Sequence, residues 1–152
     1  MITLCPYNHV RPEVLVFTIS AKGVYGLTAI VALGARFNER PVQIREIADA
    51  HEIPQHYLEQ ILVILKKGGF VESYRGAQGG YSIAREPRSI RVCDVLEVLE
   101  GRLEIVPDQK RDSELGFFWC GLERKIRELL DTTVADLLEE KSRAQHRFIY
   151  TI

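Results

Sequence analysis

The sequence predicts a mainly α-helical fold with a small β-hairpin wing, a winged helix-turn-helix that is followed by a long C-terminal helix. Two observations carry this prediction. An apolar helical pattern ends at Gly68-Gly69, and residues 70–85 then form two short strand-like segments around a glycine-rich tip. Further along, apolar residues recur at helical spacing from Leu122 to Leu138. A helix followed by a small basic hairpin indicates a protein that reads DNA rather than one that turns over a substrate.

The first three helices are expected before the hairpin. Ser20 is a suitable cap for a central core helix that runs towards Phe37, because the residues after it are apolar nearly all round. A second, short helix is expected over residues 43–51. After a tight turn, Pro54 suits the first position of a third helix, which Gly68-Gly69 ends. Two short helices joined by a tight turn predict a helix-turn-helix, with the third helix as its recognition helix.

The elements after the hairpin are less regular. A helix opens at Ser89 or Arg91 and closes at Gly101, and residues 102–116 are a polar, aperiodic loop. One long helix is expected from about Phe117, with a continuous apolar seam. The predicted organisation is therefore an N-terminal extension (1–16), a winged helix-turn-helix domain (17–101), a sensor-type loop (102–119), and a dimerisation helix with a C-terminal tail (120–152).

Composition limits the class of protein. The chain has 152 residues, 46% of them hydrophobic, which suits one domain with a well-formed core. It has no apolar run of about 18 residues that would predict a membrane span, and residues 1–19 lack the basic opening of a secretory signal. Three cysteines without paired spacing argue against a disulfide framework and predict a cytoplasmic protein.

Charge is unevenly distributed, although the net charge is only −1. Acidic residues dominate from Cys93 to Glu140, whereas the hairpin region is basic. Such a block suits a surface that binds nucleic acid, and the alternative is an ordinary solvated surface. Six basic residues against two acidic ones lie in this block: Lys66, Lys67, Arg75, Arg85, Arg88 and Arg91, against Glu72 and Glu86.

The wing tip holds one set of candidate DNA-binding residues. The planar cation of Arg75 can enter a narrow minor groove or bind phosphate, and Gln78 can donate to a phosphate or a base edge. Gly76 and Gly79 allow a tight tip. A nucleotide-binding loop is excluded because these glycines lie between two strands instead of leading into a helix. The alternative is a plain surface hairpin.

The start of the recognition helix holds the second set. Gln55, His56, Glu59 and Gln60 are its early polar positions, and N-terminal residues of such helices reach base edges. Glu59 can accept a hydrogen bond from a cytosine amine, or it can be a surface carboxylate near the helix dipole. Tyr57 is either part of the core or a phosphate contact.

The sequence contains no catalytic constellation, so no enzymatic activity is expected. Cys93 falls within an apolar helical stripe and is expected to be a small buried side chain. Cys120 opens the predicted long helix, where the helix dipole favours a thiolate. The alternative for Cys120 is an inert interface cysteine.

Three segments carry a resemblance to the Rrf2 (Rrf-two) family of bacterial regulators. These are the recognition-helix run 53–62, the wing 75–85 and the helix 90–101, with support from 20–26 and 133–137. The resemblance covers about residues 17–140 and implies a homodimer in which the long helix, within residues 117–140, crosses its partner. It also implies DNA contacts from Tyr57, Glu59 and Arg75. Family members begin near Phe17, so residues 1–16 are expected to be an extension or an upstream start.

The same resemblance raises the question of a metal centre. Cluster-binding members carry three cysteines in the loop and at the start of the long helix, and often a histidine further on. When this chain is aligned with the family pattern without gaps from the wing onward, those positions fall at Asp108, Glu114, Cys120 and Glu123. Only the position of Cys120 still holds a cysteine. Carboxylate oxygens suit Mg, Mn or Fe, whereas the sulphur suits zinc or an iron–sulphur cluster. The expectation is no cofactor, with an iron–sulphur cluster or metal ion held through Cys120 as the alternative.

The expected function is therefore that of a DNA-binding transcriptional regulator. It is predicted to act as a homodimer on a pseudo-palindromic operator of double-stranded DNA, with repression as the expected direction and a redox or iron signal as the family's suggestion. The alternative is a metal- or redox-sensing winged-helix protein that acts through a protein partner rather than through DNA.

Overall fold

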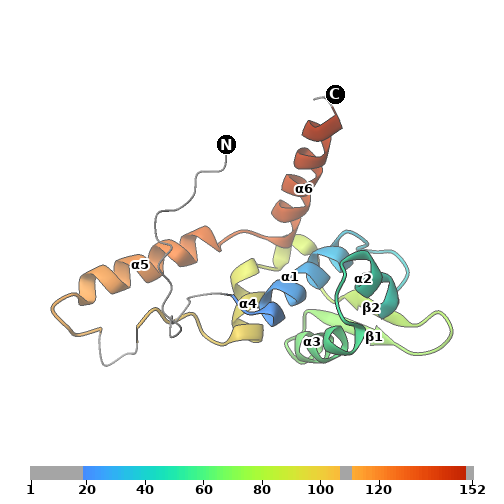
Figure 1. Cartoon of the computed structure of the whole chain (residues 1–152), viewed down its shortest axis with the longest axis horizontal. Coiled ribbons are helices and arrows are strands. Elements are labelled where there is room, and N and C mark those ends of the chain that lie inside the picture. Colours follow the sequence, from blue (N-terminus) through green and yellow to red (C-terminus); the bar gives the residue numbers. More distant parts are fainter. Residues whose placement is uncertain (1–18, 107–110, 150–152) are drawn as a thin grey trace, which may run out of the picture.

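The structure, a computed structural model, describes residues 19–106 and 111–149 (Figure 1). The extension 1–16 and Asp108 therefore lie outside the described residues. None of the described helices is long and apolar enough to cross a membrane. The elements follow in the order α1 (Ala21–Gly34), α2 (Ile44–Ala50), α3 (Gln55–Lys67), β1 (Val71–Tyr74), β2 (Gly80–Ile83), the 3-10 helix η1 (Pro87–Ser89), α4 (Val92–Glu100), α5 (Gly116–Leu129) and α6 (Val134–Ile149).

Helix α1 lies at the centre of the winged-helix body and packs against α3, α4, α6 and β2 (Figure 1). Ile30 and Leu33 are buried in the core, as the apolar pattern predicts. Gly26 allows α4 to approach closely, because a Cβ there would lie 2.3 Å from the Leu99 side chain. One face of α1 differs from the prediction, since Val24 is 52% exposed. The helix is thus apolar nearly all round but is not covered all round.

The N-terminal caps of the helices differ from those predicted. Ser20 stands at the N-cap of α1, but its side-chain oxygen accepts no backbone N–H of the helix, and its hydroxyl donates to Glu100 Oε1 (2.6 Å). Helix α2 begins with a capping box, in which Gln43 and Glu46 satisfy each other's backbone N–H groups. Pro54 is the N-cap of α3 rather than its first helical residue. The helix-turn-helix itself, α2 followed by α3, is where the sequence predicts it.

The two strands pair antiparallel, with Tyr74 opposite Gly80 next to the turn and Val71 opposite Ile83 at the open end of the hairpin. Tyr81 also exchanges two backbone hydrogen bonds with Val42, both 2.8 Å long, which tie β2 to the segment before α2. Gly80 makes this contact feasible, because a Cβ there would lie 2.4 Å from the Val42 carbonyl oxygen. The wing is therefore attached to the segment that leads into the helix-turn-helix through the start of β2.

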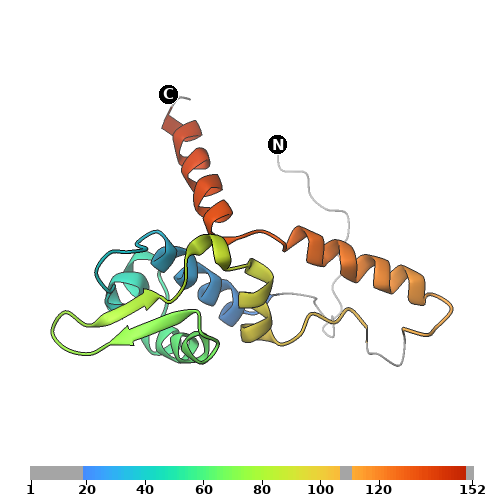
Figure 2. The same cartoon turned by 180° about the vertical axis from the view of Figure 1, so that it is seen from behind.

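The prediction of a single long C-terminal helix from about Phe117 is wrong. The structure has two helices, α5 and α6, which are separated by residues 130–133 (Figure 2). A new helix starts here because Thr133 and Asp136 bond each other: the Asp136 carboxylate accepts from the Thr133 N–H (2.8 Å) and hydroxyl (2.7 Å). The segment is also held away from a helical path by the bond from Val92 N–H to Thr132 O (2.9 Å).

The predicted apolar seam is consequently split between the two helices, with the α6 part buried and the α5 part exposed. On α6, Val134 is completely buried and Leu138 packs against the core, so this half of the seam covers the chain's own winged-helix body. On α5, apolar side chains stay open to solvent, with Leu129 80% exposed and Phe118 51% exposed. Figures 1 and 2 show α5 extending away from the body. No α5 side chain belongs to the hydrophobic core that the described residues form.

Candidate nucleic-acid interface

The first turns of α3 present polar side chains on the outside and apolar ones on the inside. Gln55, His56 and Glu59 are exposed, whereas Leu58 is completely buried. Tyr57 is half-buried and meets the ring of Tyr25 edge-on, with 6.0 Å between ring centroids. Burial of Leu58 and the ring contact fix the rotation of α3 about its axis. The three exposed side chains therefore stand on the open face of the helix.

Glu59 and the wing lie close enough to influence each other electrostatically. Tyr81 of β2 has a raised pKa, first because it is half-buried and second because of the negative charge of Glu59. Among the described residues the Glu59 carboxylate has neither a hydrogen-bond nor an ion-pair partner. An exposed acceptor beside the wing is thus available for a ligand.

The wing tip requires its glycines. Gly76 has a φ of +104°, a conformation that residues with a Cβ rarely adopt. The N–H of Gly79 donates to the Gly76 carbonyl oxygen (2.9 Å), and a Cβ on Gly79 would lie 2.4 Å from the Tyr74 carbonyl oxygen. Arg75, just before Gly76, and Gln78, just before Gly79, are exposed. The tip is therefore a tight turn that presents one cation and one amide outward.

Several side chains of the basic block predicted around the wing make contacts within the protein itself. Arg91 pairs with Asp131, and Arg88 lies 4.0 Å from Glu139 of α6. The Arg85 guanidinium lies over the Phe70 ring, 4.6 Å from its centroid. The Lys66 ammonium bonds the Ser73 hydroxyl and so joins the end of α3 to β1. Within the described chain, the exposed cations Lys67 and Arg75 have no acidic partner.

The family's metal-ligand positions do not come together as a metal site in the part that the structure describes. No group of three His, Cys, Asp or Glu side chains there is arranged to hold an ion, and Asp108 lies outside that part. Glu114 and Cys120 are exposed. Cys120 stands in the second turn of α5, because the helix begins at Gly116, and the dipole effect is confined to the first turn. The donor set that the described residues offer does not fit a cluster.

Glu123, at the fourth of those positions, is instead an ion-pair partner. Its carboxylate is nearly buried and accepts from Arg111 Nη2 (2.9 Å) and from Arg127 Nε (3.5 Å). Arg127 also donates to Glu97 Oε1 of α4 (2.8 Å) and to the carbonyl oxygen of Leu103 (3.0 Å). The bond to Glu97 raises the pKa of Arg127. Two guanidinium groups beside Glu123 oppose a cation at this carboxylate.

A second cysteine lies in the body of the protein. Cys93 of α4 is half-buried rather than fully buried, and burial raises the pKa of its thiol. It faces a cavity of about 330 Å³ that is lined with charged residues such as Arg91, Arg124 and Asp131. The expectation of a small buried side chain is therefore met only in part.

Comparisons with known proteins place this geometry in a family. The family model described as Rrf2, an iron-dependent transcriptional regulator, matches residues 19–140. The regulator CymR of Bacillus subtilis is 36% identical over 141 residues, which cover 88% of this chain and 99% of CymR. Its solved structure has a TM-score of 0.70 and covers 82% of this chain and 98% of that one. The structure of IscR from T. potens, 41% identical, has a TM-score of 0.71 and covers 84% and 90%.

The class that the fold and the exposed surface define is a winged-helix transcriptional regulator that binds DNA. The chain belongs to the Rrf2 family.

Some residues of the site are not apparent from the sequence. The contacts of Tyr81 and Lys66 do not follow from local sequence, because their partners, Glu59 and Ser73, lie elsewhere in the chain. For Arg127 the sequence offers one local signal, since Glu123 stands four residues before it, the spacing of a helical ion pair. That local signal would have found one of its three contacts.

Proposed function

We propose that the chain is a cytoplasmic, non-enzymatic regulator that binds double-stranded DNA as a homodimer. The recognition helix α3 contributes Gln55, His56, Tyr57 and Glu59, and the wing contributes Arg75, Gly76, Gln78 and Gly79. The observation that carries the proposal is that an acceptor on α3, Glu59, stands beside a wing whose tip presents an arginine. Helix residues in the major groove read bases, while a wing arginine reaches phosphates or the minor groove.

The exposed face of α5 supports a homodimer. Leu115, Phe118, Leu122, Ile126 and Leu129 follow one another at steps of three or four residues and form one stripe. Leu115, Phe118 and Leu129 are each at least half exposed. A contiguous apolar stripe that the chain leaves uncovered marks an association surface. A second copy would cover it through an isologous contact, in which each α5 buries the other's stripe.

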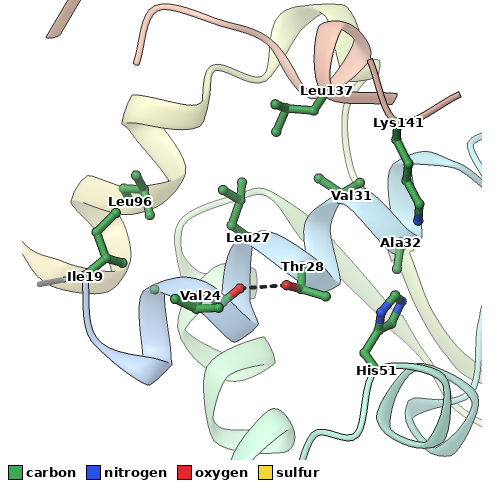
Figure 3. A pocket seen from close by; sticks show the side chains of 11 residues that line it. Ile19, Val24, Leu27, Thr28, Val31, Ala32, His51, Leu96, Leu137 and Lys141 are labelled. Carbon is green, nitrogen blue, oxygen red and sulfur yellow. Dashed lines mark hydrogen bonds between the residues drawn. The ribbon is translucent and has the colours of Figure 1, made fainter. Parts of the chain in front are cut away.

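The body of the protein offers an apolar groove that suits the same association. It has a volume of about 430 Å³ and lies between α1, α4 and the start of α6 (Figure 3). Val24, Leu27 and Leu96 line it, and the Thr28 hydroxyl is bonded to the Val24 carbonyl oxygen (2.8 Å). His51 and Lys141 supply its other polar side chains. Such a surface suits apolar side chains of a second copy better than a polar small molecule.

We propose further that this regulator works without an iron–sulphur cluster at the family's ligand positions. The support is chemical: Glu123 is held by two guanidinium groups, and the exposed thiol of Cys120 belongs to no group of three His, Cys, Asp or Glu side chains that could hold an ion within the described residues. Clusters need several sulphur ligands. The signal that controls DNA binding would then be a ligand or partner rather than iron.

Selection of binding sites from random DNA tests the proposed function. The purified protein is incubated with random duplexes of about 30 base pairs, long enough for two half-sites one or two helical turns apart. Bound duplexes are amplified and sequenced. The expected result is one enriched motif with two-fold symmetry. Absence of enrichment would contradict DNA reading, and an enriched motif without symmetry would contradict the homodimer.

A further inference from the structure

Helix α5 is joined to the winged-helix body mainly by polar contacts, and Arg127 lies at their centre. One guanidinium group bonds three elements: Glu97 of α4 (2.8 Å), the Leu103 carbonyl oxygen after α4 (3.0 Å), and Glu123 of α5 itself (3.5 Å). The bonds to Glu97 and to Leu103 connect α5 with α4 and with the segment that follows it. A planar guanidinium can satisfy several oxygens in fixed directions, which an ammonium cannot.

The loop between α4 and α5 is held by the same cluster. Near its start, the Leu103 carbonyl accepts from Arg127, and near its end Arg111 donates to Glu123 (2.9 Å). The side chains of Glu123 and Arg111 are 12% and 28% exposed, and that of Arg127 is 35% exposed. These partly buried, multiply bonded charges are screened less than the exposed pairs on the surface of α5.

This cluster lies where it can fix the direction of α5 relative to the winged-helix body. The helix contributes nothing to the hydrophobic core of the described residues, so packing does not fix its angle to the body. At the C-terminal end of α5, the connection 130–133 is held to the start of α4 by the bond from Val92 N–H to Thr132 O (2.9 Å) and by the ion pair of Arg91 with Asp131. The bonds of Arg127, within the last turn of α5, add the side-chain contacts of the helix itself, and together these polar contacts set the direction in which α5 leaves the body.

We propose that Arg127 is a positioning residue that sets the distance between the two recognition helices of the dimer. This inference rests on the proposed homodimer. If two α5 helices pair, each angle between α5 and its own body determines where each α3 stands on the DNA. The Arg127 cluster then determines which spacing of half-sites the dimer accepts, although no member of the cluster is proposed to touch DNA.

The test is a series of duplexes with altered half-site spacing. The selected operator is compared with versions in which one base pair is added or removed between the half-sites, a displacement of about 3.4 Å and a tenth of a turn. Wild-type protein should prefer its own spacing by about tenfold or more, the value of one good base contact. Arg127→Gln should reduce this preference to about threefold or less and leave the affinity for a single half-site unchanged.

Two further variants separate positioning from loss of charge. Arg124→Gln removes the same charge from an exposed pair on α5, where Arg124 and Glu128 are 3.9 Å apart, and should keep the wild-type preference. Glu97→Gln removes the partner on α4 without changing α5, and should widen the spacing tolerance as Arg127→Gln does, even if the latter folds poorly.

The outcomes distinguish the inference from the function on which it rests. A wild-type spacing preference in both Arg127→Gln and Glu97→Gln would overturn the positioning role while DNA binding stands. An equal loss of preference in Arg124→Gln would also overturn it, because any charge change on α5 would then suffice. Failure of the wild-type protein to bind a two-fold symmetric duplex would overturn the proposed function, and this inference with it.

Discussion

Leu129→Ala should weaken the dimer strongly. Leu129 is 80% exposed in the protomer, so a second copy has most of the side chain left to bury. The substitution removes three carbons, each worth about 0.8 kcal/mol on burial, or about 2 kcal/mol per protomer after allowing for the part already covered. An isologous contact loses this twice, about 4 kcal/mol in all. Because about 1.4 kcal/mol is a factor of ten, the dimer dissociation constant should rise about 1,000-fold.

Sedimentation equilibrium over a wide range of protein concentrations measures this constant. Arg124→Ala is the matched control, because Arg124 lies on the opposite side of α5 and is exposed. It should leave the dissociation constant within about threefold of wild type. If Leu129→Ala and Arg124→Ala dissociate alike, the α5 stripe is not the dimer interface and the reasoning from exposed apolar surface is refuted.

Three further results are expected. Glu59→Ala should relax base discrimination at one position per half-site more than it lowers overall affinity, and equal losses on selected and scrambled duplexes would argue against base reading. Hydrogen bonds from Thr133 lower the pKa of Asp136. The ionised carboxylate therefore stabilises the folded state at pH values above the ordinary aspartate pKa of about 3.9, and this stabilisation is lost as the pH falls through the lowered pKa. Asp136→Asn should therefore flatten the fall in Tm between about pH 5 and pH 3, and an unchanged slope would reject this. Cys120→Ala should bind the selected operator like wild type in anaerobic and oxidised samples, and iron bound to wild type but lost from this variant would refute the cluster-free proposal.

The parts of the fold that the sequence predicted well are governed by local chemistry. The end of α3 at Gly68-Gly69 and the glycine-dependent wing tip depend on neighbours a few residues away. The break between α5 and α6 cannot be predicted from the sequence, because the apolar period continues through it, from Leu130 to Val134. It depends on Thr133 bonding Asp136 and on Val92, forty residues earlier, bonding Thr132. Tertiary contacts thus override the helical period here.

The candidate site was predictable to a similar extent. The polar face of α3 and the arginine of the wing follow from the helical period and from turn chemistry. The contact between Arg127 and Glu97 does not, because the two residues are thirty positions apart and no period connects them. The same is true of the ion pair of Arg111 with Glu123, which occupies a carboxylate that the family register assigned to a metal.

Operator affinity of the Arg75→Ala variant tests the central claim most directly. Fluorescence anisotropy on the selected duplex is measured over a salt series for wild type, Arg75→Ala and Arg143→Ala, the last being an exposed arginine of α6 paired with Glu139. Arg75→Ala should weaken binding by about 1–3 kcal/mol, with a salt slope smaller by about one if the arginine contacts phosphate, while Arg143→Ala matches wild type. Folded Arg75→Ala protein that binds the operator as tightly as wild type at every salt concentration would contradict the claim that the wing contacts DNA.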